Sequence, residues 1–200
     1  MTTESSHERK RQKICMVALD IFSARGFEGT TLEAVAEALD YTKPALYYYF
    51  DSKEALFRAL VLDSLREAGS RIEAIRAEAK PASEKIRDLI RMYLDDHFTR
   101  RGYFSISHVL SGFKAKLLEG PDREEIERLS SGIPRAIVAM ISQGVEAGEF
   151  VAEDPEVLGG IVIAMLSGLL IHIGMPALAA LDRDRLKSIL DDIIVKGISL

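Results

Sequence analysis

The sequence predicts an all-α protein in which a small N-terminal three-helix unit precedes a larger C-terminal helical body. Apolar residues recur at helical spacing throughout the 200 residues, and no segment alternates in the manner of a β-strand. Capping residues, glycines and prolines divide this pattern into helices of moderate length. We expect the N-terminal unit to cover residues 1–57 and the body to cover residues 58–200, with one long helix belonging to both.

The first two helices of the N-terminal unit have clear start and stop signals. The first is predicted at residues 8–24 and ends at Gly26, because glycine readily takes the left-handed conformation that closes a helix. Thr30 and Glu33 have the spacing of a capping box, which predicts that the second helix opens there. Both helices have one apolar face and therefore suit a small shared core.

A third short helix and a long fourth helix complete the N-terminal unit. Thr42 is the predicted cap of the third helix, whose first turn holds Pro44. Asp51 is the predicted cap of the fourth, with Glu54 three residues later. The apolar spacing of the fourth helix continues as far as Pro81, which stops it.

Longer and less polar helices are expected in the body. Glycine or proline marks every break between them. The predicted helices lie at about residues 83–99, 102–117, 122–147, 155–173 and 183–198.

Composition narrows the possible functions. The chain is 48% hydrophobic and 28% charged, which is ordinary for a soluble globular protein. A net charge of −5 does not suggest nucleic-acid binding, so such a function would have to depend on a local basic patch. A single cysteine, Cys15, excludes an internal disulfide and suits a reducing cytosol. The N-terminus lacks the apolar core of a signal peptide, and we expect a cytoplasmic protein.

The segment from Val157 to Leu181 contains no Asp, Glu, Lys or Arg and is long enough to span a membrane. However, Gly174 and Pro176 would break such a helix, and the flanking residues are mainly acidic. A helix that is apolar all round can also be buried in protein or in a dimer interface. We therefore predict no membrane association.

Residues 30–49 have the layout of a helix-turn-helix, in which the second helix enters the DNA major groove. In that second helix, Leu46 and Phe50 are four residues apart and are predicted to point inward. Lys43 and Tyr47 then lie on the outer side. A positive charge and an aromatic ring on that side suit contacts with base edges and phosphates.

The aromatic run Tyr47-Tyr48-Tyr49 is the most unusual feature of this helix. A tyrosine ring can lie against thymine methyl groups or sugars, while its hydroxyl reaches a phosphate. The alternative is that the rings pack in the core, as aromatic residues in helices often do. For Tyr49 both interpretations stay open, because half of the helix must face the core.

Three segments, FSARGFEGTT, TKPALYYYF and DSKEALF, resemble the DNA-binding signature of the TetR family of bacterial transcriptional regulators. The resemblance is dense over residues 10–60, whereas the rest of the chain is similar to the family in length and helical layout. It implies an operator-binding homodimer with a small-molecule effector site in its body. The DNA-contacting residues that it implies are Thr31, Thr42, Lys43, Pro44, Ala45, Tyr47, Tyr48, Tyr49 and Lys53. A basic cluster at Arg9, Lys10, Arg11 and Lys13 would approach the flanking backbone.

The chain departs from the family pattern at the helix-turn-helix turn. Asp40 stands where many relatives have glycine, and Tyr41 stands where a small aliphatic residue is common. Asp tolerates the left-handed conformation better than most residues, so we expect the turn to form.

We predict an effector pocket in the segment RRGYFSISHVLSGFKAK. Phe104, His108 and Phe113 mix aromatic rings with a hydrogen-bonding group, and Met140 and Met165 would form the opposite wall. Ordinary core packing is the alternative for each of them. An apolar or aromatic effector is expected, because no basic cluster is present to hold a phosphate.

The last two long helices are predicted to form a four-helix dimer interface with a second subunit. Small residues four apart on the first of them would allow close approach. The expected interface residues are Gly160, Ala164, Gly168, Leu186, Ile189, Leu190, Ile193 and Ile194.

No sequence motif supports catalysis or a cofactor. A glycine-rich phosphate loop, a nucleophile elbow and an H-E-x-x-H motif are all missing from the sequence. Asp95, Asp96 and His97 are adjacent and would diverge on a helix, so we expect no metal site. We therefore expect a ligand-responsive repressor, not an enzyme. The alternatives are an interaction protein that keeps the helix-turn-helix as a scaffold, and a DNA-binding protein without a ligand switch.

Overall fold

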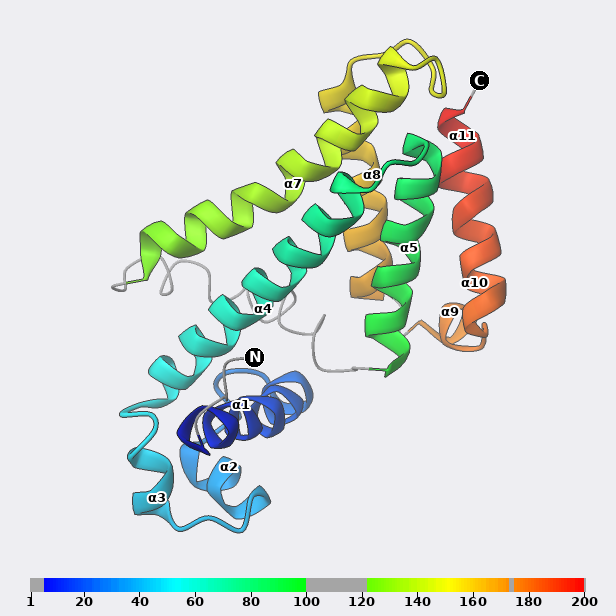
Figure 1. Ribbon diagram of the computed structural model, residues 1–200. Helices are drawn as coiled ribbons and strands as arrows, with labels where there is room; N and C mark the ends of the chain where they lie inside the picture. The colour runs from blue at the N-terminus through cyan, green and yellow to red at the C-terminus, as the bar shows by residue number, and fades with distance from the viewer. Residues whose placement is uncertain (1–5, 100–121, 173–174, 200) are drawn as a thin grey trace. The chain divides into compact units, whose positions relative to one another are not determined.

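The computed structural model describes residues 6–99, 122–172 and 175–199, and these are helical with short connections (Figure 1). The all-α prediction is confirmed, since an isolated bridge between Phe150 and Ser199 is the strand-like pairing recorded among the described residues. The elements are α1 (Ser6–Arg25), α2 (Leu32–Ala38), α3 (Lys43–Tyr47), α4 (Lys53–Ala77), α5 (Ala82–Thr99), α7 (Arg123–Glu146), α8 (Pro155–His172), α9 (Pro176–Ala179), α10 (Arg183–Leu190), a π-helical turn η1 (Asp191–Val195) and α11 (Lys196–Ile198).

The described residues divide into two compact units. The first contains residues 6–64 together with 122–126, and the second contains residues 65–99 together with 127–199. The first unit therefore includes the beginning of α4 and takes in the first turn of α7.

Three aromatic rings form the centre of the first unit. The ring centroids of Phe22 and Phe57 are 5.0 Å apart, and those of Phe27 and Phe57 are 5.2 Å apart. Apolar residues of α1, α2 and α3 are buried in the same unit, among them Ile14, Val35 and Leu46. Because these side chains are fully buried, the short helices are held by packing rather than by their own helix propensity.

Two of the predicted helix caps in this unit lie one residue from the real ones. The side chain of Thr31, not Thr30, accepts the hydrogen bond from the backbone of Ala34 at the start of α2. The Thr30 hydroxyl is buried and donates instead to the carbonyl oxygen of Gly26, at 2.8 Å. At the start of α4, the Ser52 hydroxyl accepts from the Ala55 amide at 3.0 Å, where Asp51 was expected to act.

The second unit is built around α5, which lies beside α8 and the terminal helix in Figure 1. Ile86, Leu89 and Ile90 of α5 are fully buried and share a core with residues of α7, α8 and α10. Glu149, which lies far from α5 in the sequence, caps the N-terminus of that helix. Its carboxylate accepts hydrogen bonds from the backbone amides of Ala82 and Ser83, each at 2.9 Å. A contact between residues far apart in the sequence thus caps the N-terminus of α5.

Two charged groups are buried in the second unit, and both have partners. The Asp96 carboxylate accepts two hydrogen bonds from Arg71, at 2.6 and 2.7 Å. The Lys85 ammonium donates to the carbonyl oxygen of Arg76 at 2.8 Å and to the Gln143 side chain at 2.9 Å. Burial of a charge is tolerated only with such partners, so these contacts link α5 firmly to α4 and α7.

The C-terminal segment differs from the single helix predicted at 183–198. A π-helical turn at Asp191–Val195 separates α10 from α11, and the consecutive residues Ile194 and Val195 are both buried in it. A short helix, α9, also forms in the segment expected to be a break. Among the helices that the structure describes, none is long and apolar enough to cross a membrane.

Candidate nucleic-acid interface

Helices α2 and α3 form a compact pair joined by a tight turn. The turn contains the non-glycine residue Asp40 in the left-handed region, with φ of 55°. The Tyr41 amide donates to the carbonyl oxygen of Ala36 at 2.9 Å, which ties the turn back to α2. The expectation that Asp40 would adopt this conformation is confirmed, and the helix-turn-helix layout is present.

The two faces of α3 differ as its sequence predicts. Leu46 is fully buried and Phe50, just beyond the helix, is 5% exposed, so the inner face of α3 is buried within the unit. On the outer side Lys43 and Pro44 are exposed, Tyr47 is 39% exposed and Tyr48 is 74% exposed. Large apolar rings left in solvent on one helix indicate a surface that binds a partner.

The hydroxyl groups of Thr31 and Thr42 lie at the N-termini of α2 and α3. Thr31 accepts from the Ala34 amide at 3.2 Å, and Thr42 accepts from the Ala45 amide at 3.3 Å. Both side chains are exposed and each hydroxyl still has its own proton to donate. A helix N-terminus also favours a negative charge, so both positions suit a phosphate oxygen.

Lys43 is tied to the preceding helix by an ion pair. Its ammonium pairs with the carboxylate of Glu33 on α2 and lies 5.7 Å from the centre of the Tyr47 ring. The hydrogen bond from Lys43 lowers the pKa of Glu33, and the same bond raises the pKa of Lys43. Both groups are therefore charged at neutral pH.

Lys53, which was predicted to bind a phosphate, is held by contacts within its own unit. Its ammonium donates to the carbonyl oxygen of Phe27 at 2.9 Å and lies 4.3 Å from the centre of the Phe27 ring. Glu28 lies 4.0 Å from the same ammonium. One of its three N–H donors is thus used on the Phe27 carbonyl oxygen, and a phosphate would share the ammonium with Glu28.

His7 was missed by the sequence analysis. Its ring lies 4.8 Å from that of Tyr49 and 5.8 Å from that of Tyr48, while those two tyrosines are 5.2 Å apart. The half-buried Tyr49 therefore packs against α1 and helps to orient Tyr48. About forty residues separate His7 from the tyrosines, and no local pattern connects them.

The predicted basic cluster of α1 is divided between two roles. Arg9, Lys10 and Lys13 are exposed. Arg11 instead forms ion pairs with Glu8 at 3.5 Å and Asp63 at 3.4 Å, and its guanidinium lies 5.6 Å from the centre of the Phe50 ring. Arg11 is therefore part of the internal packing.

The structure describes only two of the five residues predicted to line the effector pocket. Phe104, His108 and Phe113 lie outside the described residues. Met140 is fully buried in the core of the second unit, and Met165 is partly buried against that core. Where they are described, the predicted wall residues thus pack as core residues.

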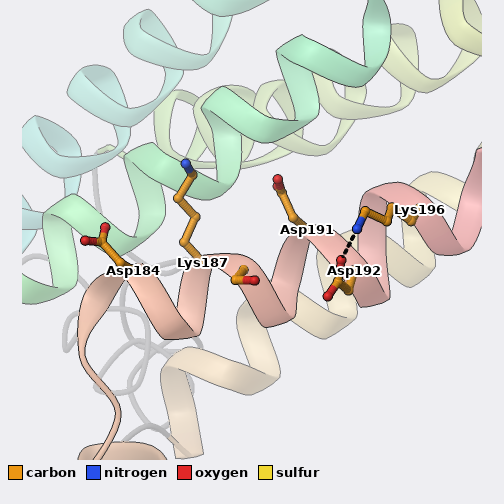
Figure 2. Close-up of a pocket in the computed structure, with 6 residues that line it drawn as sticks. Asp184, Lys187, Asp191, Asp192 and Lys196 are labelled. Atoms are coloured by element: carbon orange, nitrogen blue, oxygen red, sulfur yellow. Dashed lines mark ion pairs between the residues drawn. The ribbon is translucent and has the colours of Figure 1, made fainter.

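Figure 2 shows an open hollow of about 360 Å³ along α10 and η1. Its lining is polar and charged, which does not suit an apolar effector. The lining residues are Asp184, Lys187, Ser188, Asp191, Asp192 and Lys196.

The predicted dimer residues fall into two groups. Gly160 and Ala164 of α8 are exposed together with their neighbours Val157 and Ile161. Ile193 is exposed, and Gly168 and Ile189 are half-buried. Leu186, Leu190 and Ile194 are instead buried in the core of the same chain. These three face α5, because α10 and η1 use that face to close the body of their own subunit.

The fold and the exposed face of α3 define a helix-turn-helix DNA-binding protein. A family model described as bacterial regulatory proteins of the tetR family matches residues 14–60, and one described as a tetracyclin repressor-like C-terminal domain matches residues 79–170. The HTH-type transcriptional regulator RutR of Escherichia coli K12 is 33% identical over 151 residues, which are 74% of this chain and 67% of RutR. The chain therefore belongs to the TetR family, whose members are transcriptional regulators.

Other relatives are similar over shorter segments or in fold alone. The biofilm-operon negative regulator IcaR of Staphylococcus aureus is 39% identical over 51 residues, 26% of this chain and 27% of IcaR. The ketosteroid regulator KstR2 of Mycobacterium tuberculosis has a TM-score of 0.79 at 20% identity, over 96% of this chain and 95% of KstR2. AibR, solved with isovaleryl coenzyme A and operator DNA, has a TM-score of 0.76 at 19% identity, over 93% of this chain and 98% of AibR.

Proposed function

We propose that this chain is a dimeric repressor that occupies a near-palindromic operator and leaves it when a small apolar or aromatic effector binds the body. The observation that carries the DNA-binding part is the outer face of α3, where Lys43, Tyr47 and Tyr48 are exposed while Leu46 anchors the helix from behind. Such a helix can enter the major groove without losing its attachment to the core.

The surroundings of α3 suit the phosphate backbone on either side of the groove. Thr31 and Thr42 present hydroxyl donors at helix N-termini, and Arg9, Lys10 and Lys13 supply exposed positive charge on α1. Contacts of this kind position a protein on DNA without reading its sequence. The local charge thus offsets a chain whose overall charge is −5.

Two copies are needed to read two half-sites about 34 Å apart. We assign an exposed stripe on α8 to the contact with the second subunit. The stripe consists of Val157, Gly160, Ile161 and Ala164, and the exposed Ile193 of η1 is assigned to the same contact. Small residues within the stripe allow two helices to approach closely. Leu186, Leu190 and Ile194 are no longer included in this surface.

The effector is proposed to bind in the body. AibR, whose fold is similar, was solved with isovaleryl coenzyme A and operator DNA, which supports the proposal that a protein of this fold binds both DNA and a small molecule. We keep Phe104, His108 and Phe113 as the proposed lining of this site, together with Met140 and Met165. We infer that the protein acts in the cytoplasm, where bacterial operators are, and that it is a regulator without catalytic activity.

The test is binding of the full chain to the DNA upstream of its own gene, compared with unrelated DNA of equal length. Tyr47→Ala should weaken operator binding by about 5–150-fold, as expected for the loss of one base contact. The control is Met16→Ala, which removes an exposed apolar side chain from α1 of the same unit and should leave binding unchanged. Equal affinity of the wild-type chain for both DNAs would contradict the proposal and favour a scaffold role.

A further inference from the structure

The lysine on the outer face of α3 is held by an acid on the neighbouring helix. The Lys43 ammonium pairs with the Glu33 carboxylate, which stands in the first turn of α2, and lies against the Tyr47 ring. The two charged side chains are 60% and 50% exposed, so both can reach a partner in solution. The ion pair therefore lies in the surface that we assign to DNA.

A carboxylate in such a surface is unexpected on electrostatic grounds alone. It repels phosphates, and it neutralises a lysine that would otherwise release a DNA counterion on binding. An exposed ion pair also contributes little to stability. The ion pair therefore adds little to the stability of the fold, and its main effect is on the position of the Lys43 ammonium.

The geometry limits the positions that the Lys43 ammonium can take. A free lysine has a long flexible side chain and can turn to whichever phosphate is nearest. The ammonium that pairs with Glu33 also lies 5.7 Å from the centre of the Tyr47 ring, which places it at the junction of α2 and α3. From that junction it accompanies α3 into the major groove, where guanine presents the O6 and N7 acceptors that lysine reads.

We propose that Glu33 is a specificity-determining residue, which keeps Lys43 directed at a base in the groove and prevents it from binding phosphates of any sequence. This inference rests on the proposed function, because it requires α3 to lie in the major groove. Glu33 itself touches no base and acts through Lys43. The consequence is weaker binding to non-specific DNA and a larger ratio of operator to non-specific affinity.

The electrostatics of the pair agree with this role. Because a helix N-terminus stabilises negative charge, Glu33 is favoured as a carboxylate in the first turn of α2. The hydrogen bond from Lys43 lowers the pKa of Glu33, so the acid stays ionised over the physiological range. Its hold on Lys43 is therefore present wherever the protein would meet DNA.

The experiment compares Glu33→Gln with Glu37→Gln, an exposed acid on the same helix for which no ion pair is recorded among the described residues. Affinities for operator and for unrelated DNA are measured over a series of salt concentrations. Glu33→Gln should raise the affinity for non-specific DNA. It should also steepen the slope of log affinity against log salt concentration by about 0.9, the effect of one additional phosphate contact. The ratio of operator to non-specific affinity should fall by about fivefold or more, and Glu37→Gln should leave that ratio unchanged.

Lys43 provides the second arm of the test. In a Lys43→Met background, Glu33→Gln should have no effect beyond that of Glu37→Gln, because the lysine that it controls is gone. Without DNA, an NMR titration should show the pKa of Glu33 rising toward its ordinary value in Lys43→Met. An unaltered Glu33 pKa would show that the pair does not form in solution and would overturn the inference.

The possible failures can be told apart. A wild-type chain that shows no operator preference contradicts the proposed function and the inference with it. A clear wild-type preference, combined with equal behaviour of Glu33→Gln and Glu37→Gln, overturns the inference alone, because Glu33 would then act only through net charge. Thermal melts of each variant confirm that these exposed substitutions leave the fold intact.

Discussion

The Lys53 ammonium donates a 2.9 Å hydrogen bond to the carbonyl oxygen of Phe27 and lies 4.3 Å from the centre of that residue's ring. This contact joins the first turn of α4 to the segment between α1 and α2, twenty-six residues earlier in the chain. Phe27 in turn packs against Phe22 and Phe57. Lys53 therefore stabilises the aromatic core of the first unit as well as standing at its surface.

Replacing Lys53 by methionine should lower the stability of the first unit by about 1–3 kcal/mol, through loss of a charged hydrogen bond and of the ring contact. Urea unfolding measures this, with Lys13→Met as a control that removes an exposed lysine of α1. If Lys53 also binds a phosphate, the folded variant should lose about 0.9 from the salt slope of DNA binding. A variant as stable as the wild type would show that the Phe27 contact is unimportant.

Asp40 in the helix-turn-helix turn has a φ of 55°, a conformation in which side chains with a branched Cβ are strained. Asp40→Val should therefore destabilise the unit by about 1–2 kcal/mol, whereas Asp40→Gly should be neutral or stabilising by up to about 1 kcal/mol. Thermal melts of the two variants provide the measurement. A valine variant that melts with the glycine variant would indicate that the turn adopts another conformation.

Gly144 of α7 faces the ring of Phe150 at very short range. A Cβ added there would lie 2.2 Å from Cδ2 of Phe150 and 2.9 Å from Cβ of Ala82, whereas one added at Gly132 of the same helix would meet no atom within 4 Å. Gly144→Ala should destabilise the body by about 1–3 kcal/mol, because a buried ring must move. Gly132→Ala should stabilise it by up to about 1 kcal/mol, the difference in helix propensity.

Chemical denaturation of the two glycine variants, side by side, checks this contrast. The pair serves as its own control, since both variants add one methyl group to the same helix. Equal stability of the two would mean that the close approach of Gly144 to Phe150 does not exist in solution.

Glu149 should make stability depend on pH. Burial acts to raise the pKa of its carboxyl group, but hydrogen bonds from the backbone amides of Ser83 and Ala82 outweigh it and lower the pKa below the ordinary value of 4.5. A lowered pKa in the folded state means that the stabilisation is present above pH 4.5 and is lost as pH falls through the folded-state pKa.

Glu149→Gln should consequently cost about 0.5–2 kcal/mol at pH 7, the usual effect of losing a helix cap, and the difference from wild type should shrink below about pH 4.5. Urea midpoints measured between pH 3 and pH 7 test this, with Glu153→Gln as an exposed control. A difference that stays constant over this pH range would contradict a capping role for the carboxylate.

The proposed dimer surface is tested at two exposed isoleucines. Ile161 is 49% exposed and Ile193 is 54% exposed, so an aspartate at either position should leave the subunit folded. If the surface is buried between subunits, each aspartate places an unpaired charge in the interface, which is strongly unfavourable. Light scattering should then report a monomer for each variant and a dimer for Met16→Asp, and dimeric variants would mean that another surface is used.

The sequence by itself determined the all-α class, the four helices of the N-terminal unit, the inward direction of Leu46 and Phe50, the cap at Thr42 and the left-handed turn at Asp40. These features depend on contacts within one helical turn, where spacing along the chain equals spacing in the structure. The same reasoning placed two other caps one residue away, at Thr30 and Asp51. In both places two adjacent residues were able to cap, and helix spacing does not distinguish them; the residues that cap are Thr31 and Ser52. The helix predicted at residues 102–117 lies outside the described residues.

Only the tertiary structure decided which element covers each apolar face. Helical spacing groups Leu186, Leu190 and Ile194 together, but it does not say whether α5 of the same chain or a second subunit lies against them; here it is α5. The partners of His7, Lys53 and Glu149 were likewise out of reach, since each contacts a residue more than twenty positions away. Such contacts arise from the packing of whole helices, which no local pattern of residues encodes.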